Sequence, residues 1–116
     1  MKILIVDDSP IMRTILRKFV RRYSDDILEC SDGEEAIFLY DQHRPDWVLM
    51  DIQMKNMDGI TATKRIRQTH PAARIVMVSQ YSDKHFKDAA VNAGVCNYVF
   101  KENLLELQTI LNPDQV

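Results

Sequence analysis

Residues 2–10 read KILIVDDSP, in which four consecutive aliphatic residues are followed by two aspartates, a serine and a proline. A short, continuous apolar run that is bounded by turn residues is typical of a strand buried on both faces of a parallel sheet. Residues 47–51, which read WVLMD, repeat this arrangement. We therefore expect two buried strands, each of which ends at an aspartate.

Short aliphatic runs alternate with helical patterns along the whole chain. The predicted strands are residues 3–6, 27–30, 47–50, 75–78 and 96–100. Alternating strands and helices are typical of an α/β fold in which helices cover both faces of a parallel sheet. With 116 residues, the chain is also of ordinary length for one domain. The sequence thus predicts a single doubly wound domain over residues 1–116, with five strands and five helices.

Capping residues and apolar stripes predict where the helices begin and which side faces the core. Ser9 is a candidate N-cap, and Pro10 suits the first helical position. The expected core-facing stripe of this first helix is Ile11, Ile15, Leu16, Phe19 and Val20. The later helices are expected to begin at Asp32, after Asp58, near Asp83 and at Asn103. The last is expected to run to Leu111, with Pro113 as the stop signal.

Composition excludes several function classes. The formal net charge of −2 argues against a nucleic-acid-binding surface, which needs clustered Lys and Arg. No apolar run approaches the length of a membrane span, and the N-terminus has no leader-like pattern. We therefore expect a cytoplasmic protein without direct contacts to nucleic acid or membrane.

Aspartates at the ends of two predicted strands indicate where the chemistry takes place. In doubly wound sheets, ligands bind beyond the carboxyl ends of the strands, where the strand order reverses. In the order 2-1-3-4-5, Asp7, Asp8 and Asp51 would meet there. Three carboxylates so close together repel one another, and a hard divalent cation such as Mg²⁺, which prefers oxygen ligands, relieves that repulsion. Ser79 and Lys101 also follow predicted strands, and a hydroxyl and an ammonium suit phosphoryl transfer.

Together these residues resemble a known family. The pair Asp7-Asp8 after KILIV, the stretch DIQMKNMDG that begins at Asp51, Ser79 after IVMV, and NYVFK ending in Lys101 resemble the response-regulator receiver domain. The resemblance covers essentially the whole chain. It implies a flavodoxin-like fold, a five-stranded parallel sheet in the order 2-1-3-4-5 with five helices.

The resemblance also implies a role for each matching residue. Asp51 would be the phosphoacceptor, and Asp7, Asp8, Asp51 and the main-chain carbonyl of Gln53 would hold Mg²⁺. The phosphoryl-binding residues would be Ser79 and Lys101. Ser79 and Tyr98 would form the switch: Ser79 moves toward the phosphoryl group, the following loop follows, and Tyr98 turns inward.

Partners follow from the same resemblance. The phosphodonor would be a histidine kinase or a phosphotransfer protein, and the receiver would catalyse only its own phosphorylation and hydrolysis. The altered surface would be the fourth helix, the fifth strand and the fifth helix, read by a downstream protein or by an output domain outside this chain. Receivers often form homodimers through this same surface.

Three positions depart from the family pattern. Lys55 and Glu102 each replace a common proline, and we predict a trans peptide bond between Lys101 and Glu102, because a cis bond before a residue other than proline costs about 3 kcal/mol. Gln80 stands where many receivers have a small residue. It is expected to restrict access to Asp51 and to slow phosphoryl transfer or hydrolysis.

Cysteines and histidines are interpreted as structural or surface residues. Cys30 and Cys96 are expected to be small buried apolar residues on opposite edge strands, about 19 Å apart at about 4.8 Å per strand spacing. That separation is beyond disulfide reach. His43, His70 and His85 have no metal-ligand spacing and are expected at the surface.

Two other functions use similar residues. A haloacid-dehalogenase-like phosphohydrolase would place its general acid two residues after the nucleophile, but Ser9 stands two residues after Asp7. A pseudo-receiver would keep the fold and act by protein interaction without phosphate. Lys55, Gln80 and Glu102 are the departures that favour the pseudo-receiver.

Overall fold

The computed structural model describes residues 1–112, which form five strands and five helices in strict alternation. The strands are β1 (Lys2–Val6), β2 (Asp26–Cys30), β3 (Trp47–Met50), β4 (Ile75–Ser79) and β5 (Asn97–Phe100). The helices are α1 (Pro10–Val20), α2 (Gly33–His43), α3 (Gly59–Thr69), α4 (Lys84–Ala93) and α5 (Glu106–Leu111). Each predicted strand is found within one residue of its expected ends.

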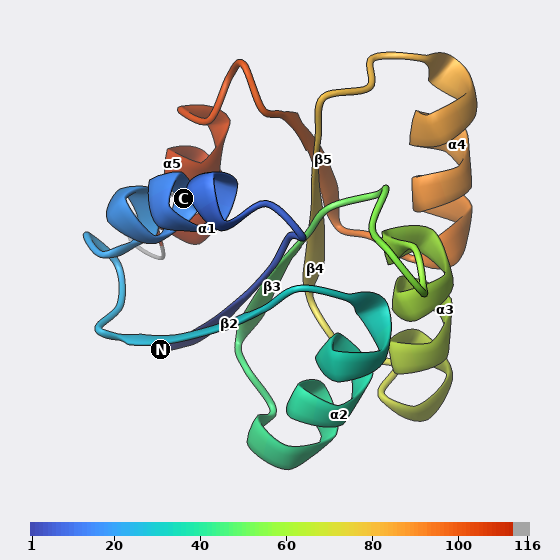
Figure 1. Ribbon diagram of the computed structural model, residues 1–116, viewed down its shortest axis with the longest axis horizontal. Coiled ribbons are helices and arrows are strands. Elements are labelled where there is room, and N and C mark those ends of the chain that lie inside the picture. The colour runs from blue at the N-terminus through green and yellow to red at the C-terminus, as the bar shows by residue number, and fades with distance from the viewer. Residues whose placement is uncertain (113–116) are drawn as a thin grey trace.

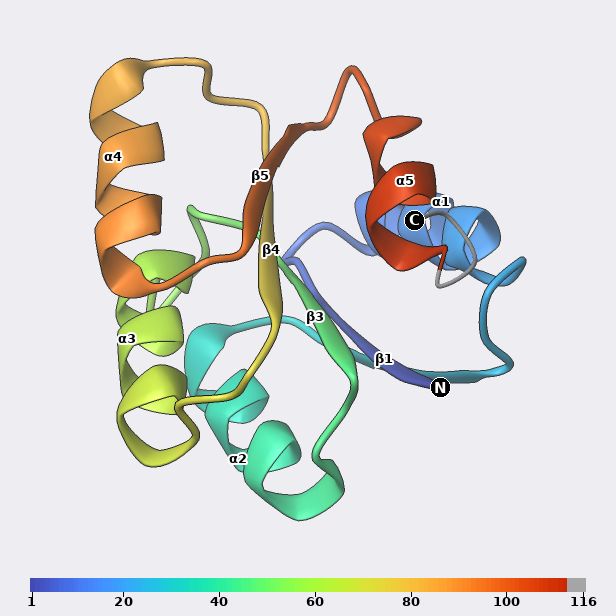
Figure 2. The ribbon, with the colours of Figure 1, turned by 180° about the vertical axis from the view of Figure 1, so that it is seen from behind.

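All neighbouring strands pair in parallel, in the order β2-β1-β3-β4-β5. This is the predicted flavodoxin-like order, with β1 and β3 at the centre. Figure 1 shows α1 and α5 on one side of the sheet and α2, α3 and α4 on the other, and Figure 2 shows the same two layers from behind. No helix within residues 1–112 is long and apolar enough to span a bilayer.

Alternate residues of the central strands pack into separate cores on the two faces. Ile3 and Ile5 of β1 belong to the core beneath α1 and α5, whereas Leu4 and Val6 belong to the core beneath α2, α3 and α4. All four side chains are at most 1% exposed. An uninterrupted aliphatic run is therefore required, because both faces of β1 are buried.

The core-facing stripe of α1 is predicted only in part. Leu16, Phe19 and Val20 face the core, but Ile11 and Ile15 are 75% and 45% exposed. Met12 packs in their place. The helix begins at Pro10, so its buried stripe follows Met12, Leu16 and Phe19, and Ile11 lies about a quarter-turn away from it.

Three further expectations need correction. Cys96 is exposed, because it precedes β5 and only its main-chain N–H joins the sheet, while Cys30 is buried as predicted. His70 is half-buried against the Tyr40 ring. The last helix begins at Glu106 and not at Asn103, whose side chain instead donates a hydrogen bond to Glu106. The helix ends at Leu111, as predicted, and Pro113 lies outside the described residues.

Other expectations about the backbone and the thiols are confirmed. No peptide bond in the described chain is cis, so the bond between Lys101 and Glu102 is trans. Both cysteines are free. Cys30 ends β2 and Cys96 directly precedes β5, and these two strands are the edges of the sheet.

Candidate functional site

The register of the two central strands brings two aspartates together. Val6 is paired with Met50 at the carboxyl ends of β1 and β3, so the next residues, Asp7 and Asp51, emerge side by side. The main-chain N–H of Asp51 continues the ladder by donating to the Val6 carbonyl at 2.9 Å. Asp7 and Asp51 are only 1% and 6% exposed. Two buried carboxylates therefore lie at the topological switch point of the sheet.

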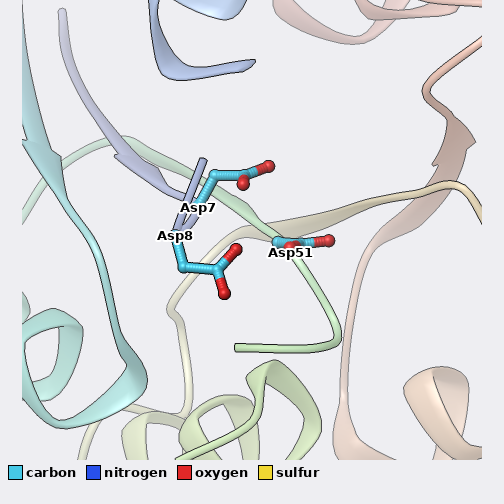
Figure 3. A group of neighbouring side chains, drawn as sticks. All are labelled: Asp7, Asp8 and Asp51. Atoms are coloured by element: carbon cyan, nitrogen blue, oxygen red, sulfur yellow. The ribbon is translucent and has the colours of Figure 1, made fainter. Parts of the chain in front are cut away.

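Asp8 completes an acidic cluster at this edge. Figure 3 shows Asp7 and Asp8 from the end of β1 beside Asp51 from the end of β3. One carboxylate oxygen from each of the three lies within 4.8 Å of the others. Asp8 is exposed, so the cluster is open to solvent on one side.

Lys101 reaches this cluster from the end of β5. Its main-chain N–H donates to the carbonyl of Ser79 at 2.9 Å, which holds the residue beside the end of β4. The Lys101 Nζ lies 3.0 Å from Asp7 Oδ2 and 3.2 Å from Asp51 Oδ1. The ammonium thus contacts two of the three clustered carboxylates, so the cluster keeps an excess of negative charge.

Burial makes this excess charge costly. Burial, with a further contribution from the negative charge of Asp7, raises the pKa of Asp51 to about 6, although Lys101 acts in the opposite direction. Burial alone would lower the pKa of Lys101, but the charges of Asp51 and Asp7 outweigh burial and raise it above the ordinary value. Burial thus acts in opposite directions on the two groups: it disfavours the carboxylate of Asp51, whereas the nearby carboxylates keep the Lys101 ammonium charged.

The donor set of the cluster fits a hard divalent cation. Asp7 Oδ2 is buried, and it lies 3.0 Å from the Lys101 ammonium. Asp8 and Gln53 line the same adjoining cleft of about 440 Å³. Carboxylate and carbonyl oxygens beside an open cleft are the ligands that Mg²⁺ prefers. The residues present therefore fit Mg²⁺.

Ser79 is buried at the end of β4, and its hydroxyl belongs to a different group of contacts. Its Oγ accepts a hydrogen bond from the main-chain N–H of Tyr81 at 2.9 Å, and it lies near enough to the Tyr98 hydroxyl to lower the pKa of that group. The Tyr98 hydroxyl in turn donates to the Tyr81 carbonyl at 2.7 Å. Burial raises the pKa of Tyr98 above its ordinary value. Tyr98 thus already points inward and holds the segment after β4.

Gln80, which follows Ser79, is exposed. The structure thus brings together Asp7, Asp8, Asp51 and Lys101, and it places the Ser79 hydroxyl with Tyr81 and Tyr98.

Two important residues near the site do not appear among the predicted site residues. Gly59 was identified only as a helix start, but a Cβ there would lie 1.8 Å from the carbonyl oxygen of Asp51. Tyr81 contacts Ser79 and Tyr98, and its hydroxyl donates to Gln53 Oε1 at 2.5 Å. The adjacent Asp58-Gly59 pair in the sequence could have indicated the role of Gly59. No periodic sequence pattern indicates the role of Tyr81.

Comparison with known proteins identifies the family. The sequence profile of the response regulator receiver domain matches residues 3–112. This chain belongs to the response regulator receiver domain family. Receiver domains of this family are the signal-receiving parts of two-component systems, and they bind Mg²⁺ at an acidic pocket.

Several relatives resemble this receiver domain closely. The chemotaxis protein CheY of Bacillus subtilis (strain 168) is 39% identical over 101 residues, which are 86% of this chain and 84% of that protein. A LuxR-family response regulator from Aurantimonas sp. SI85-9A1 has a TM-score of 0.85 at 34% identity, with 98% of this chain and 91% of that chain covered. In the CheX-CheY-BeF3-Mg complex from Borrelia burgdorferi, the matching chain has a TM-score of 0.86 at 28% identity, with 95% and 87% covered.

Proposed function

We propose that this receiver accepts a phosphoryl group on Asp51 from a phosphohistidine of a histidine kinase or a phosphotransfer protein. The observation that carries the proposal is the convergence of Asp7, Asp8, Asp51 and Lys101 at the ends of three strands. Asp51 is the carboxylate that lies at the centre of the sheet edge and contacts the Lys101 ammonium. We also propose that residues 1–116 constitute one receiver domain.

The proposed reaction needs a nucleophile and positive charge. A carboxylate oxygen of Asp51 bonds to phosphorus, the phosphorus–nitrogen bond of the donor histidine breaks, and its electron pair stays on the imidazole nitrogen. Lys101 neutralises charge on the phosphoryl oxygens. Mg²⁺, held by Asp7, Asp8, Asp51 and the Gln53 main-chain carbonyl, would supply further neutralisation. Attack of water on the acyl phosphate later releases phosphate and restores the Asp51 carboxylate.

The proposed signal passes from this pocket to the surface formed by α4, β5 and α5. Supporting contacts link Ser79 at the pocket to Tyr98 on β5 through the main chain of Tyr81, and the Ser79 hydroxyl also influences the pKa of Tyr98. A Ser79 hydroxyl that turns to the phosphoryl group would alter both contacts, and this is the kind of local charge change that biases a two-state element. A downstream protein, an attached output domain or a second copy of the receiver would read the altered surface.

A direct test uses Mg²⁺ with acetyl phosphate, followed by intact-mass measurement and peptide mapping. We expect one phosphoryl group on the wild type, none on Asp51→Asn, and a full one on Asp88→Asn, whose carboxylate lies on α4 outside the pocket. Beryllofluoride with Mg²⁺ should perturb the tyrosine environment in an Asp51-dependent way. A wild type that responds to neither reagent would establish the phosphate-independent interaction module instead.

The phosphohydrolase alternative has less support. Ser9, at the position where such an enzyme carries its general acid, accepts a hydrogen bond from the Met12 N–H as the N-cap of α1. A serine hydroxyl is a far weaker acid than a carboxylic acid, so Ser9 is a poor general acid at neutral pH. Steady turnover of p-nitrophenyl phosphate that is lost in Asp7→Asn would nevertheless restore this alternative.

A further inference from the structure

Helix α4 begins without the side-chain cap that the first three helices have. The side chains of Ser9, Asp32 and Asp58 each accept a hydrogen bond from a main-chain N–H in the first turn of α1, α2 and α3. Asp83 occupies the corresponding position before α4 and makes no such bond. Uncapped helix ends fray easily. Other contacts must therefore hold the first turn of α4.

Such a contact comes from Tyr81, in the segment between β4 and α4. Its ring stacks on the ring of Phe86, with centroids 4.8 Å apart and planes 28° apart. Phe86 belongs to the first turn of α4 and packs against the core beneath α2, α3 and α4. The place of this first turn therefore depends on where the Tyr81 ring lies.

The hydroxyl end of the same side chain reaches the loop that follows the proposed acceptor. It donates a hydrogen bond to Gln53 Oε1 at 2.5 Å, and Gln53 is two residues from Asp51. In Figures 1 and 2 the segments that follow β3 and β4 lie at the same end of the sheet. A continuous path thus runs from Gln53 through the phenol of Tyr81 to Phe86 on α4.

The main chain of Tyr81 makes a separate set of contacts. Its N–H donates to Ser79 Oγ, and its carbonyl accepts from the Tyr98 hydroxyl. Neither bond involves the phenol of Tyr81. The side-chain path to α4 and the main-chain path to Tyr98 can therefore be separated by substitutions that alter only the phenol.

We infer that Tyr81 is a positioning residue that couples the loop after Asp51 to α4 through its side chain, in parallel with the Ser79–Tyr98 contacts. The inference rests on the proposed function, because it assigns to the phosphorylated pocket a second route to the same surface. Phosphorylation changes the charge beside the loop that contains Gln53 and displaces that loop. The hydrogen bond between Gln53 and the Tyr81 hydroxyl transmits the displacement to the Tyr81 ring. The ring, stacked on Phe86, then repositions the uncapped start of α4.

The decisive variant is Tyr81→Phe, which keeps the ring and both main-chain bonds and removes only the bond to Gln53. Beryllofluoride with Mg²⁺ is added, and amide chemical shifts and hydrogen exchange are followed by NMR. We expect the change in exchange rate of the α4 amides from Lys87 onward to be reduced about five-fold, as for the loss of one ordinary hydrogen bond. The shifts at Tyr98 should remain. Tyr23→Phe, the same chemical change in the core beneath α1 and α5, should behave as wild type.

A double-mutant cycle with Gln53→Met tests whether the two side chains act as a pair. Gln53→Met removes the amide but keeps the main-chain carbonyl, so it should reduce the α4 response as Tyr81→Phe does, and the double variant should lose no more. Additive losses, or a wild-type response of α4 in Tyr81→Phe, would overturn the inference while Asp51 phosphorylation stands.

The same cycle in the resting protein does not depend on phosphorylation. Here each variant should speed exchange of the α4 amides about five-fold, again without additivity. If beryllofluoride has no effect on the wild type, the proposed function fails, and this resting measurement still decides whether Tyr81 holds α4. Equal resting exchange in all four proteins would refute the link itself.

Discussion

Asp51 carries its charge where the fold makes that charge costly. Burial and the neighbouring Asp7 outweigh the attraction of Lys101, and they raise the pKa of Asp51 from 3.8 to about 6. The folded protein thus holds a proton on Asp51 more tightly than the unfolded chain does. Binding of a cation, or of a phosphoryl group together with its cation, therefore removes much of the electrostatic cost of the Asp51 charge.

This shift predicts how the stability of the metal-free protein depends on pH. Between about pH 4 and about pH 6 the folded state holds more protons than the unfolded state, so the contribution of Asp51 to stability falls as pH rises through this window. The full cost persists above about pH 6. Asp51→Asn should therefore raise the free energy of unfolding at pH 7 in EDTA by about 1–3 kcal/mol, and Mg²⁺ should narrow the difference.

Urea denaturation at pH 4 and at pH 7 checks this prediction. The gain from Asp51→Asn should be small at pH 4, where the wild-type Asp51 is already protonated. Asp88→Asn, on the exposed side of α4, should change little at either pH. A variant that is less stable than wild type at pH 7 without metal would contradict the assigned charge balance.

Gln80 is exposed beside Ser79, so we expect its side chain to act by restricting the access of the phosphodonor and of water to Asp51. Gln80→Ala should speed both phosphorylation by acetyl phosphate and the subsequent decay, because a smaller side chain leaves more room for donor and water. Stopped-flow fluorescence and loss of the phosphorylated mass measure the two rates. Unchanged rates would show that the Gln80 amide does not screen the site.

The acids and the lysine of the site were predictable because each directly follows a strand. Asp7, Asp51 and Lys101 are positioned by parallel pairing, which the aliphatic runs before them already indicate. The contacts of Tyr81 were not predictable, because they join side chains of two loops whose shapes depend on the whole fold. The same reason explains why Ser79 contacts Tyr81 and Tyr98 and not the acids.

At the scale of elements, the turn from β3 into α3 leaves no room for a side chain. The Gly59 N–H donates to the Ile52 carbonyl at 2.7 Å, and a Cβ on Gly59 would lie 1.8 Å from the Asp51 carbonyl oxygen and 2.9 Å from Met50 Cγ. The carbonyl cannot move without disturbing the residue that carries the proposed acceptor. Close packing of Gly59, the first residue of α3, against the Asp51 carbonyl therefore fixes the position of the Asp51 main chain.

Gly59→Ala should destabilise the protein by about 3 kcal/mol, the cost of forcing atoms into a filled space. It should also weaken Mg²⁺ binding, because the Asp51 main chain is displaced. Gly94→Ala is the matched control: Gly94 ends α4 at a φ of 106°, and its Cβ would lie 2.8 Å from Arg67 Nε, far from the acids. Thermal unfolding and isothermal titration with Mg²⁺ distinguish the two, and equal Mg²⁺ affinity in wild type and Gly59→Ala would contradict this account.

Helix positions were predicted well, but helix faces and ends less so. Capping residues gave the starts of α1, α2 and α3, because the cap is a local interaction. The buried face of α1 depends on how the helix lies on the sheet, so Ile11 and Met12 could not be told apart from periodicity alone. The late start of α5 follows from the turn after Lys101, where the Asn103 N–H bonds to the Phe100 carbonyl.

For the whole molecule, five short aliphatic runs were enough to predict a parallel sheet with helices on both faces. The order 2-1-3-4-5 was not contained in those runs, because several orders bury the same strands. It came from the resemblance of the motifs to the receiver family. Long-range pairing is therefore the part of the fold for which local sequence patterns carried the least information.

The fold predicts very different reactivities for the two thiols. Burial raises the pKa of Cys30 to about 12, whereas Cys96 lies exposed at the opposite edge of the sheet. In native protein, dithionitrobenzoate should modify one thiol within minutes, and the second only as fast as the protein unfolds. Cys96→Ser should lose the fast phase entirely. Two fast thiols, or none, would contradict the burial of Cys30 and the exposure of Cys96.

Pairing of β1 with β3 has a consequence for how the chain is made. Once residue 51 has left the ribosome, all three aspartates have been made, but Lys101 is translated fifty residues later. At about 5–20 residues per second, the nascent chain spends about 3–10 s with this cluster lacking its ammonium. Mutual repulsion would keep the central strands apart during that interval, so we expect the emergence of β5 to trigger closure of the whole sheet in one late step.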